Sequence, residues 1–376
     1  MQLVLIGNPE NRRSQFLKEA VNHKLLPPLL IISYESLLEN PEILHTLPDS
    51  GWLKIDSPGE NFKVYKQILA LAPDESRYNH IPAHEALQLP YDEGRIYYSH
   101  QWYAGFKILL HKIELALKNK PGLRLVNSID SIELFFDKIA SKHMLSKNAI
   151  ATPAFLDEIL HYDHLHQVLE QKKHQQVFIK LAHGSSGAGV LAYRKNKKGQ
   201  EMLTTSVELV NEGDSVKLYN SLKIRRYTDY KEIRTIINIL AKERIYAEQW
   251  IPKASQSGGF FDLRCVTIGG EPTHMVMRQS RSPITNLHLG NARGDLSYLK
   301  QSMSDEQWKN IMTLARKTAH TFNDARLIGL DILLPPKLDK PMIIEANAFG
   351  DLLPRILHGN ENTYEATVSY LLQEKK

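Results

Sequence analysis

Cysteine is nearly absent from the chain, since Cys265 is the only one among 376 residues. A single thiol excludes an intramolecular disulfide, which fits a reducing compartment. No run of about 18 apolar residues occurs, so we expect no membrane-spanning helix. The apolar run that follows Met1 is also too short for a signal peptide. These absences together predict a cytoplasmic protein with no membrane partner.

A strong charge of one sign is also missing. The sequence has 47 basic and 42 acidic residues, so its formal net charge is only +5. A small and dispersed excess does not favour nucleic acid as a partner, although it suits a protein that handles anions such as phosphates. The length is sufficient for two or three domains with cores of their own.

The dinucleotide-binding glycine motif is absent from the N-terminus as well. Residues 2–7 and the region near Leu29–Ser33 have the composition of buried strands, and a helical pattern lies between them, which predicts a Rossmann-like start. The intervening loop, GNPENRR, lacks GxGxxG, so a dinucleotide site is not expected there. Arg12 and Arg13 either contact an anionic substrate or belong to a solvated first helical turn, and we favour the second interpretation.

Two helices are predicted next. Apolar residues at helical spacing predict a helix over 100–118, whose first residues, His100, Gln101 and Tyr103, are weak candidates for anion binding by a helix N-terminus. Asp130 and Glu133 have capping-box spacing, which predicts that a second helix begins there and continues through Lys138. Nothing local distinguishes that lysine from a solvated one.

A glycine-rich segment lies between two predicted strands, in VFIKLAHGSSGAGVLAYR at 177–194. Such a loop can bring backbone NH groups close to phosphate oxygens. It is not a Walker A loop, because no GK[ST] closes it and a strand follows. Lys180 lies in an apolar strand and needs an anionic partner, which a nucleotide phosphate would supply. The alternative is a flexible hairpin tip.

Residues 195–243 have the composition of a charged, mobile connector that ends in a helix, EIRTIINILAKE. Beyond the segment RIYAEQWIPK, alternating polarity predicts two strands that turn at Gly269-Gly270. Asp262 and Arg264 share one face of the first strand, and Arg278 lies late in the second. A polar loop with Asn286 follows, and its arginines make it attractive to anions.

Acidic residues are concentrated at 326–355, where two apolar runs predict strands joined by a turn at Pro335–Pro341. Glu345 and Asn347 are two apart and share a face, and Asp331 can face them across the hairpin. Two carboxylates and an amide oxygen suit Mg²⁺ or Mn²⁺. The alternative is a strand end with solvated acids.

The order of these segments resembles the ATP-grasp superfamily, most closely its RimK-type and glutathione-synthetase-like carboxylate–amine ligases. The resemblance covers roughly 126–355 and rests on NSIDSIELFFDK, FIKLAHGSSGAGV, YAEQWI, FDLRC, GLDILL and IIEANAFGD. The segments LIGNPENRR and QWYAGF resemble an uncharacterised bacterial ATP-grasp subfamily. The implied fold is α/β and α+β: a Rossmann-like pre-ATP-grasp domain at 1–125, then an ATP-grasp domain at 126–376. Within it, a lid lobe at about 150–250 precedes a C-terminal lobe at about 251–376.

The resemblance also implies roles for residues that match the family's motifs. The implied nucleotide-binding residues are Lys138, Lys180, Gly184, Ser185, Ser186, Gly187, Gly189, Glu248, Trp250, Ile251 and Asp262. The residues implied to act on the reacting groups are Arg264, Arg278 and Asn286. The implied ligands of Mg²⁺ or Mn²⁺ are Asp331, Glu345 and Asn347.

The implied activity is an ATP-dependent ligase that joins a small-molecule or peptide carboxylate to an amine through an acylphosphate, releasing ADP and phosphate. Two alternatives stay open: an ATP-dependent phosphotransferase, and a nucleotide-binding regulatory protein without turnover. The chain departs from the family pattern at Gly290-Asn291, where paired glycines are usual, and in the ending NAFGDLLPR. Asp351 and Arg355 in that ending are candidates to face the substrate. Whether the protein forms a homodimer is left open.

Overall fold

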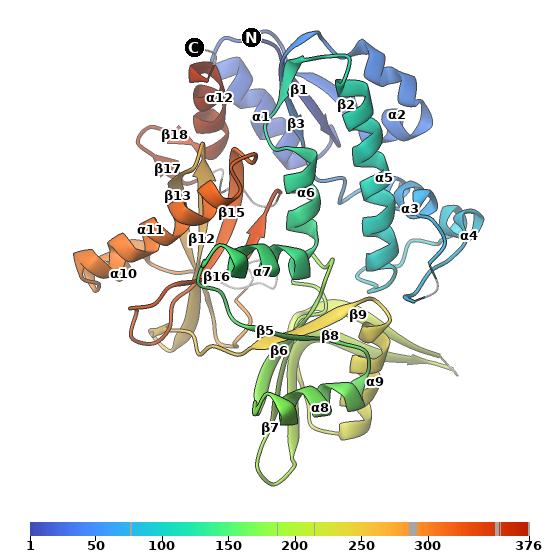
Figure 1. Ribbon diagram of the computed structural model, residues 1–376, viewed down its shortest axis with the longest axis vertical. Coiled ribbons are helices and arrows are strands. Elements are labelled where there is room, and N and C mark those ends of the chain that lie inside the picture. The colour runs from blue at the N-terminus through green and yellow to red at the C-terminus, as the bar shows by residue number, and fades with distance from the viewer. Residues whose placement is uncertain are drawn as a thin grey trace.

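A computed structural model describes residues 1–75, 77–185, 187–213, 215–285, 292–349, 353 and 355–374. Its framework is three β-sheets arranged along the long axis, with the N-terminal sheet at the top of Figure 1 and the sheet of residues 155–249 at the bottom. The mixed α/β fold expected from the sequence is confirmed. Among the described residues, no helix is both long and apolar enough to cross a membrane.

The N-terminal sheet is parallel and has the strand order β2-β1-β3-β4. Its strands are β1 (Leu3–Gly7), β2 (Leu30–Ser33), β3 (Ser50–Ile55) and β4 (Gly122–Leu125). The helices of this layer are α1 (Arg12–His23), α2 (Tyr34–Glu39), a 3-10 helix (Pro41–Thr46), α3 (Phe62–Leu71), α4 (Ala83–Gln88) and α5 (Ser99–Leu117). The predicted strand–helix–strand start is therefore present.

The C-terminal sheet has the order β14-β13-β12-β15-β16, and the short β11 pairs with β12. Its strands are β11 (Ser255–Gln256), β12 (Gly259–Ile268), β13 (Glu271–Ser280), β14 (Ala292–Arg293), β15 (Leu327–Leu333) and β16 (Met342–Asn347). The helices of this part are α6 (Ile129–Phe136), α7 (Lys138–Lys147), α10 (Leu296–Gln301), α11 (Asp305–Thr321) and α12 (Thr363–Gln373), after a small hairpin of β17 (Leu357–His358) and β18 (Glu361–Asn362). Both predicted hairpins, β12–β13 and β15–β16, are confirmed.

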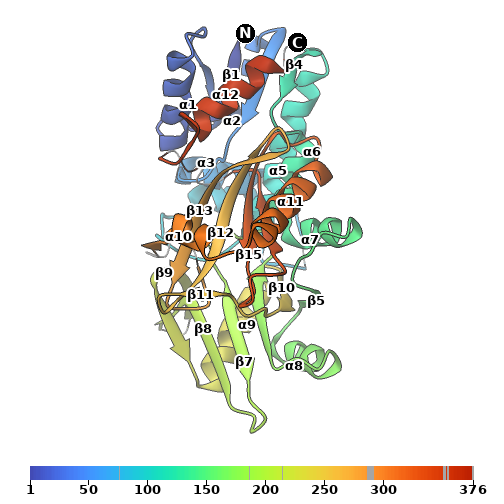
Figure 2. The same cartoon turned by 90° about the vertical axis from the view of Figure 1, so that its left-hand side faces the viewer.

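The third sheet, which we call the lid sheet, has the order β5-β10-β6-β7-β8-β9. Its strands are β5 (Phe155–Ile159), β6 (Gln176–Leu181), β7 (Leu191–Lys195), β8 (Glu201–Glu212), β9 (Ser215–Tyr227) and β10 (Ile245–Gln249). Helices α8 (Tyr162–Gln171) and α9 (Tyr230–Ala241) pack against it, as the lower part of Figure 2 shows. The glycine-rich segment joins β6 to β7, as predicted.

The prediction of a charged connector at 195–229 is wrong, because this region forms the long β8–β9 hairpin. Residues 203–207 of β8 and Leu218 of β9 are buried, whereas Glu212, Lys223 and Arg226 are exposed. The exposed charged residues give the two strands the composition of a linker, although their backbones are paired. The helix expected after the connector is α9.

The helix predicted through Lys138 is in fact two helices. Its capping-box start is also wrong, because Ser128 caps α6 and accepts from Ser131 N. Asp137 leaves the helical conformation (φ −95°, ψ 95°) and its carboxylate accepts from the NH groups of Ile139 and Ala140 at 3.0 Å each. An aspartate in this position is a strong N-cap. Lys138 therefore becomes the first residue of a new helix, α7.

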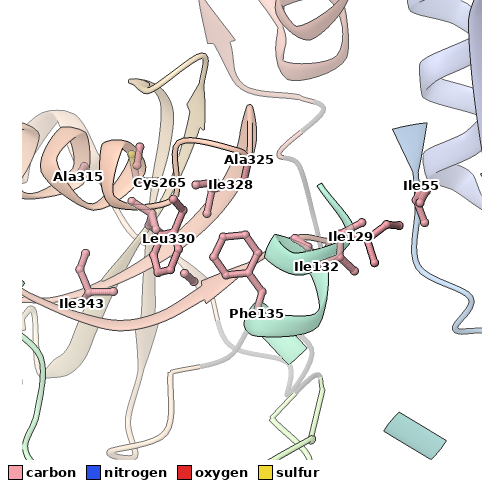
Figure 3. Packing of buried hydrophobic residues seen from close by; sticks show 14 of the residues in the cluster. Ile55, Ile129, Ile132, Phe135, Cys265, Ala315, Ala325, Ile328, Leu330 and Ile343 are labelled. Atoms are coloured by element: carbon pink, nitrogen blue, oxygen red, sulfur yellow. The ribbon is translucent and has the colours of Figure 1, made fainter. Parts of the chain in front are cut away.

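One hydrophobic core joins the N-terminal and C-terminal sheets. Figure 3 shows Ile129, Ile132 and Phe135 of α6 between Ile55 of β3 and Leu330 of β15. Cys265 is buried in the same core, and burial raises the pKa of its thiol to about 12. Such a thiol is inert at neutral pH. Helix α6 is thus the apolar link that fixes α7 relative to both sheets.

The lid sheet is attached to the N-terminal layer at two places. At the first, buried Glu243 accepts from Ser99 N (2.9 Å) at the start of α5 and from Asn79 Nδ2 (2.6 Å). At the second, residues 94–96 pair with β9, where Ile96 N donates to Leu218 O (2.9 Å). The anion at this helix start is thus the protein's own Glu243, so the proposal of substrate binding there is not supported.

Gly105 lies where α5 crosses α3. A Cβ atom at this position would be 1.9 Å from Ile68 O. Gly105→Ala should therefore force the two helices apart and lower the free energy of unfolding by about 1–3 kcal/mol. Urea unfolding measures the change, and Lys112→Ala on the exposed side of α5 should stay within about 0.5 kcal/mol of the wild type. Equal midpoints for the two variants would contradict the close crossing.

Candidate active site

Residues of the lid sheet, the C-terminal sheet and, in the N-terminal layer, α1 and the loop after β3 line one cavity of about 310 Å³. The predicted site residues that line it are Lys138, Lys180, Gly184, Ser185, Gly187, Glu248, Ile251, Asp262, Arg264, Arg278, Asp331, Glu345 and Asn347. Gly189 and Trp250 do not line it, while Ser186 and Asn286 lie outside the described residues. The chain segments that carry the predicted motifs therefore meet at a single place.

The β15–β16 hairpin places the acidic residues as the sequence predicted. Asp331 pairs with Glu345 across the hairpin, and Gly329 pairs with Asn347. The register shifts after Asp331, so that Ile344 is an extra residue on β16. A bulge of this kind redirects side chains and is common beside active sites. All three predicted metal ligands face the cavity.

Asp331 is held by two arginines from the neighbouring strands. Its carboxylate lies 3.0 Å from Arg264 Nε and 3.1 Å from Arg278 Nη2. Arg264 is the direct cross-strand partner of Asp331 on β12. The predicted catalytic arginines are therefore part of one charge network with a predicted metal ligand.

Glu345 has a different partner, Lys138 at the start of α7. Lys138 Nζ donates to Glu345 Oε1 (2.9 Å) and to Gly184 O (2.7 Å), so one ammonium joins the acid to the glycine-rich loop. Burial would raise the pKa of Glu345, but Lys138 outweighs it and the pKa is lowered. One orientation of the Asn347 amide makes two hydrogen bonds. In it, the amide nitrogen donates to Glu345 Oε1 (2.8 Å) and the amide oxygen accepts from Arg264 Nη1 (3.2 Å). Lys138, which no local pattern distinguished and only the family resemblance implied, contacts both the acid and the loop.

The oxygen atoms of Asp331, Glu345 and Asn347 are of the type that Mg²⁺ prefers. Within the described part of the chain, no group of three or more His, Cys, Asp or Glu side chains is arranged to hold a metal ion. At this site two ligands would be the carboxylates of Asp331 and Glu345 and the third the amide oxygen of Asn347. This set of oxygen atoms fits Mg²⁺. A cation would have to share these oxygens with the basic side chains that now hold them. The metal assignment stays a prediction.

A second, more deeply buried network contains Glu248 between two lysines. Its carboxylate lies 2.5 Å from Lys180 Nζ and 2.7 Å from Lys142 Nζ, and all three residues are buried. Burial would raise the pKa of Glu248, yet the two ammonium groups lower it. Lys142 also donates to Pro153 O (3.0 Å). The anionic partner that Lys180 needs is thus already within the protein.

Sequence reasoning missed Lys142, although a signal existed. It lies four residues after Lys138 on α7, and residues four apart share a helix face. Lys253 was also missed; its Nζ lies 3.0 Å from Asp262 Oδ2. Arg278 Nε donates to the other oxygen of Asp262 (2.7 Å). Burial opposes ionisation of Asp262, but Arg278 and Lys253 lower its pKa to about 2.

Part of the cavity lining is apolar and is formed by Pro153, Phe178, Ile251, Ile284 and Leu333. Trp250 packs behind this wall on the Phe178 ring, with centroids 4.8 Å apart. Strand β10 ends at Gln249, so the main-chain NH and CO groups of the residues that follow are not part of the sheet. An apolar slot beside free backbone groups is suited to a flat heteroaromatic base.

The opposite wall comes from the N-terminal layer and includes Arg13 and Glu60. Arg13 Nε lies 3.4 Å from Asp56 Oδ1. The other carboxylate oxygen of Asp56, Oδ2, accepts from Lys54 Nζ (2.9 Å). Arg12, the next residue on α1, is exposed and does not line the cavity. Of the two arginines considered from the sequence, Arg13 alone reaches this place. Arg355 is exposed and is not among the residues that line the cavity. Asp351 lies outside the described residues, so its role stays a prediction.

Residues 130–373 match the sequence model of the family described as YheC/D-like ATP-grasp. The chain belongs to this family. The resemblance to the ATP-grasp superfamily drawn from the motifs is confirmed. No curated protein sequence matches the chain.

Solved structures of ATP-grasp proteins have the same fold. The crystal structure of D-cycloserine synthetase DcsG is 11% identical, with 100% of both chains covered and a TM-score of 0.58. The ATP-grasp ligase PsnB, in complex with a minimal precursor, Mg and ADP, is 11% identical, with 100% of this chain and 98% of that chain covered and a TM-score of 0.54. D-alanine–D-alanine ligase from Bacillus anthracis is 10% identical over 99% and 96% of the two chains, with a TM-score of 0.53.

The buried Lys142–Glu248–Lys180 network gives a stability prediction for this ATP-grasp protein. Glu248→Gln would leave two buried ammonium groups without a counter-charge, and we expect a loss of about 3–5 kcal/mol of unfolding free energy. Lys142→Met leaves the balanced Lys180–Glu248 pair and should lose less. Urea unfolding at neutral pH measures both, with exposed Lys231→Met as control. A Glu248→Gln loss no larger than the Lys142→Met loss would contradict this charge balance.

Proposed function

We propose that this protein is an ATP-dependent carboxylate–amine ligase that forms an amide through an acylphosphate and releases ADP and phosphate. The observation that carries the proposal is one cavity in which basic side chains from three sequence-distant segments meet a pair of acids from the β15–β16 hairpin. The proposed organisation is a pre-ATP-grasp domain at 1–125 and an ATP-grasp domain at 126–376, with lobes dividing near residue 250.

The nucleotide is proposed to bind with its base in the apolar slot beside Phe178 and Ile251 and its phosphates at Lys138 and Lys180. Both lysines line the same cavity, and Lys180 lies two residues after Phe178 on the same face of β6. A phosphate must share Lys180 with Glu248, which stands 2.5 Å from the ammonium. The glycine-rich loop between β6 and β7 supplies backbone NH groups without Cβ atoms in the way.

Asp331, Glu345 and Asn347 are proposed to hold Mg²⁺, for which Mn²⁺ is the alternative. When bound, the metal ion neutralises phosphate oxygens and makes the γ-phosphorus a better electrophile. The protein's own part is positioning and charge neutralisation. Glu345 suits this role because its lowered pKa keeps it ionised at neutral pH.

In the proposed reaction, a substrate carboxylate oxygen forms a bond to the γ-phosphorus while the bond to the ADP oxygen breaks. Arg264 and Arg278 face the cavity and stabilise the negative charge of the acylphosphate. An amine nitrogen then bonds to the acyl carbon and gives up one proton, and phosphate leaves with the electrons of the broken C–O bond and takes up that proton. Asn286 retains its predicted role beside the intermediate but lies outside the described residues.

The carboxylate substrate is proposed to bind at the N-terminal wall. Lys54 and Arg13 contribute two positive charges there, against the negative charges of Asp56 and Glu60. Arg13 lines the cavity, and its guanidinium is the group proposed to meet an acidic group of a small molecule or peptide. Relatives of the same fold act on both kinds of substrate by their descriptions: DcsG is a D-cycloserine synthetase, and PsnB is complexed with a precursor.

The direct test is to incubate the protein with MgATP and panels of carboxylates and amines, measuring ADP release and identifying products by mass spectrometry. A new amide with free phosphate supports the ligase. A phosphorylated acceptor without amide would support the phosphotransferase, and ATP binding without turnover would support the regulatory protein.

Glu345→Gln should abolish ADP release. The substitution removes the charge that Lys138 and the metal ion both need, and a loss of about a hundredfold or more in kcat is expected. Asp339→Asn, an exposed acid in the turn of the same hairpin, is the matched control and should turn over normally. Full activity of Glu345→Gln would refute the site.

Arg13→Gln should raise the KM for the carboxylate substrate about tenfold or more while leaving the KM for ATP unchanged, because a charge-assisted hydrogen bond is lost at one substrate only. Arg12→Gln is the matched control, since Arg12 is adjacent on α1 but exposed. If both variants have the wild-type KM, the substrate does not bind at this wall.

A further inference from the structure

His183 lies at the point where the glycine-rich loop leaves β6, and it is buried. Its ring has two polar neighbours: Phe136 O is 3.2 Å from Nδ1, and Arg244 Nη1 is 3.3 Å from Nε2. A carbonyl oxygen only accepts hydrogen bonds and a guanidinium only donates them. The contacts therefore select one neutral tautomer, in which Nδ1–H donates to Phe136 O and Nε2 accepts from Arg244.

The surroundings of the ring keep it neutral. Burial, with smaller contributions from His100 and Arg244, lowers the pKa of His183 to about 3 against the opposing effect of Asp137. The Tyr103 ring stacks on it, with centroids 4.1 Å apart and planes inclined by 11°. A histidine with this pKa does not exchange protons near pH 7. It is a fixed connector between a donor and an acceptor.

Arg244 extends the connection to the start of α7. Its Nη1 also donates to Asp137 Oδ2 (3.0 Å), and its Nε donates to Glu158 Oε2 (3.3 Å) on β5. The other oxygen of Asp137 caps α7. A single guanidinium therefore joins the lid sheet, the glycine-rich loop and the helix whose first residue is Lys138.

Lys138 is hydrogen-bonded to the residues on both sides of His183. Its backbone NH donates to Ala182 O (3.0 Å), and its ammonium donates to Gly184 O (2.7 Å). The same ammonium holds Glu345. The position of the His183 backbone therefore determines the position of Gly184 O. Because the Lys138 ammonium donates to Gly184 O, its position depends on His183 as well.

We propose that His183 is a positioning residue that, together with Arg244 and Asp137, fixes the root of the glycine-rich loop and the Lys138 ammonium for the phosphates of ATP; this inference rests on the nucleotide site proposed above. His183 itself does not line the cavity. Its effect reaches the ligand through Lys138 and Gly184, which do.

The experiment compares phosphate-dependent with base-dependent binding. His183→Ala removes both hydrogen bonds of the ring, whereas His183→Asn keeps an NH donor for Phe136 O but is too short to place its acceptor oxygen at the position of Nε2. Calorimetric titration with ATP, ADP and adenosine is combined with the KM for ATP. His183→Ala should weaken ATP and ADP between about tenfold and a hundredfold and leave adenosine unchanged, with His183→Asn between it and the wild type.

His166→Ala is the matched control, because His166 is a half-buried histidine of the lid sheet's helix α8 that contacts Tyr193 and Lys195 instead. It should bind all three ligands as the wild type does. Thermal unfolding verifies that each variant is folded. Should His183→Ala not fold, Arg244→Lys provides the same comparison, since it keeps the charge but cannot bridge His183, Asp137 and Glu158 at once.

The inference is overturned if His183→Ala binds ATP as the wild type does, or if it loses affinity for ATP and adenosine equally, which would indicate a general packing role. Wild-type protein that binds neither ATP nor ADP would overturn the proposed function together with this inference. Wild-type binding with an unaffected His183→Ala would overturn this inference alone.

Discussion

The site depends on the pairing of buried carboxylates with buried basic side chains. Asp331, Glu345, Glu248 and Asp262 each contact one or two basic side chains, and three of the four are buried. An unpaired charge in such a place is strongly destabilising. The cavity can therefore be polar and still be part of a stable fold, and an anionic ligand enters a network that already contains the cations it needs.

The strands at the centre of the site were predictable because their polarity pattern is simple. Both strands of the β15–β16 hairpin are apolar apart from the residues that face the cavity, and the prolines of the turn mark its ends. Two-residue periodicity then places Glu345 and Asn347 on one face. Lys138 was not predictable in this way, since its importance depends on Asp137 ending one helix and starting the next.

Two features could not be predicted from the sequence: the pairing of the β8–β9 hairpin and the buried contacts of Glu248. The two strands resemble a linker because they carry many charged residues, and what commits them to a sheet is packing against β7 and the core of the same layer. Likewise, Lys142 and Lys253 are ordinary surface-type residues in sequence. Only the folded chain brings each to a buried carboxylate.

The attachment of Glu243 to the first turn of α5 has a thermodynamic consequence. This carboxylate belongs to the lid sheet's side of the molecule, and the NH group that it satisfies belongs to a helix of the N-terminal layer. Rotating the lid sheet away would leave a buried acid and an uncapped helix behind. A rotation of the lid sheet away from the cavity and the fraying of α5 are therefore coupled, so whatever stabilises the first turn of α5 also favours the closed cavity.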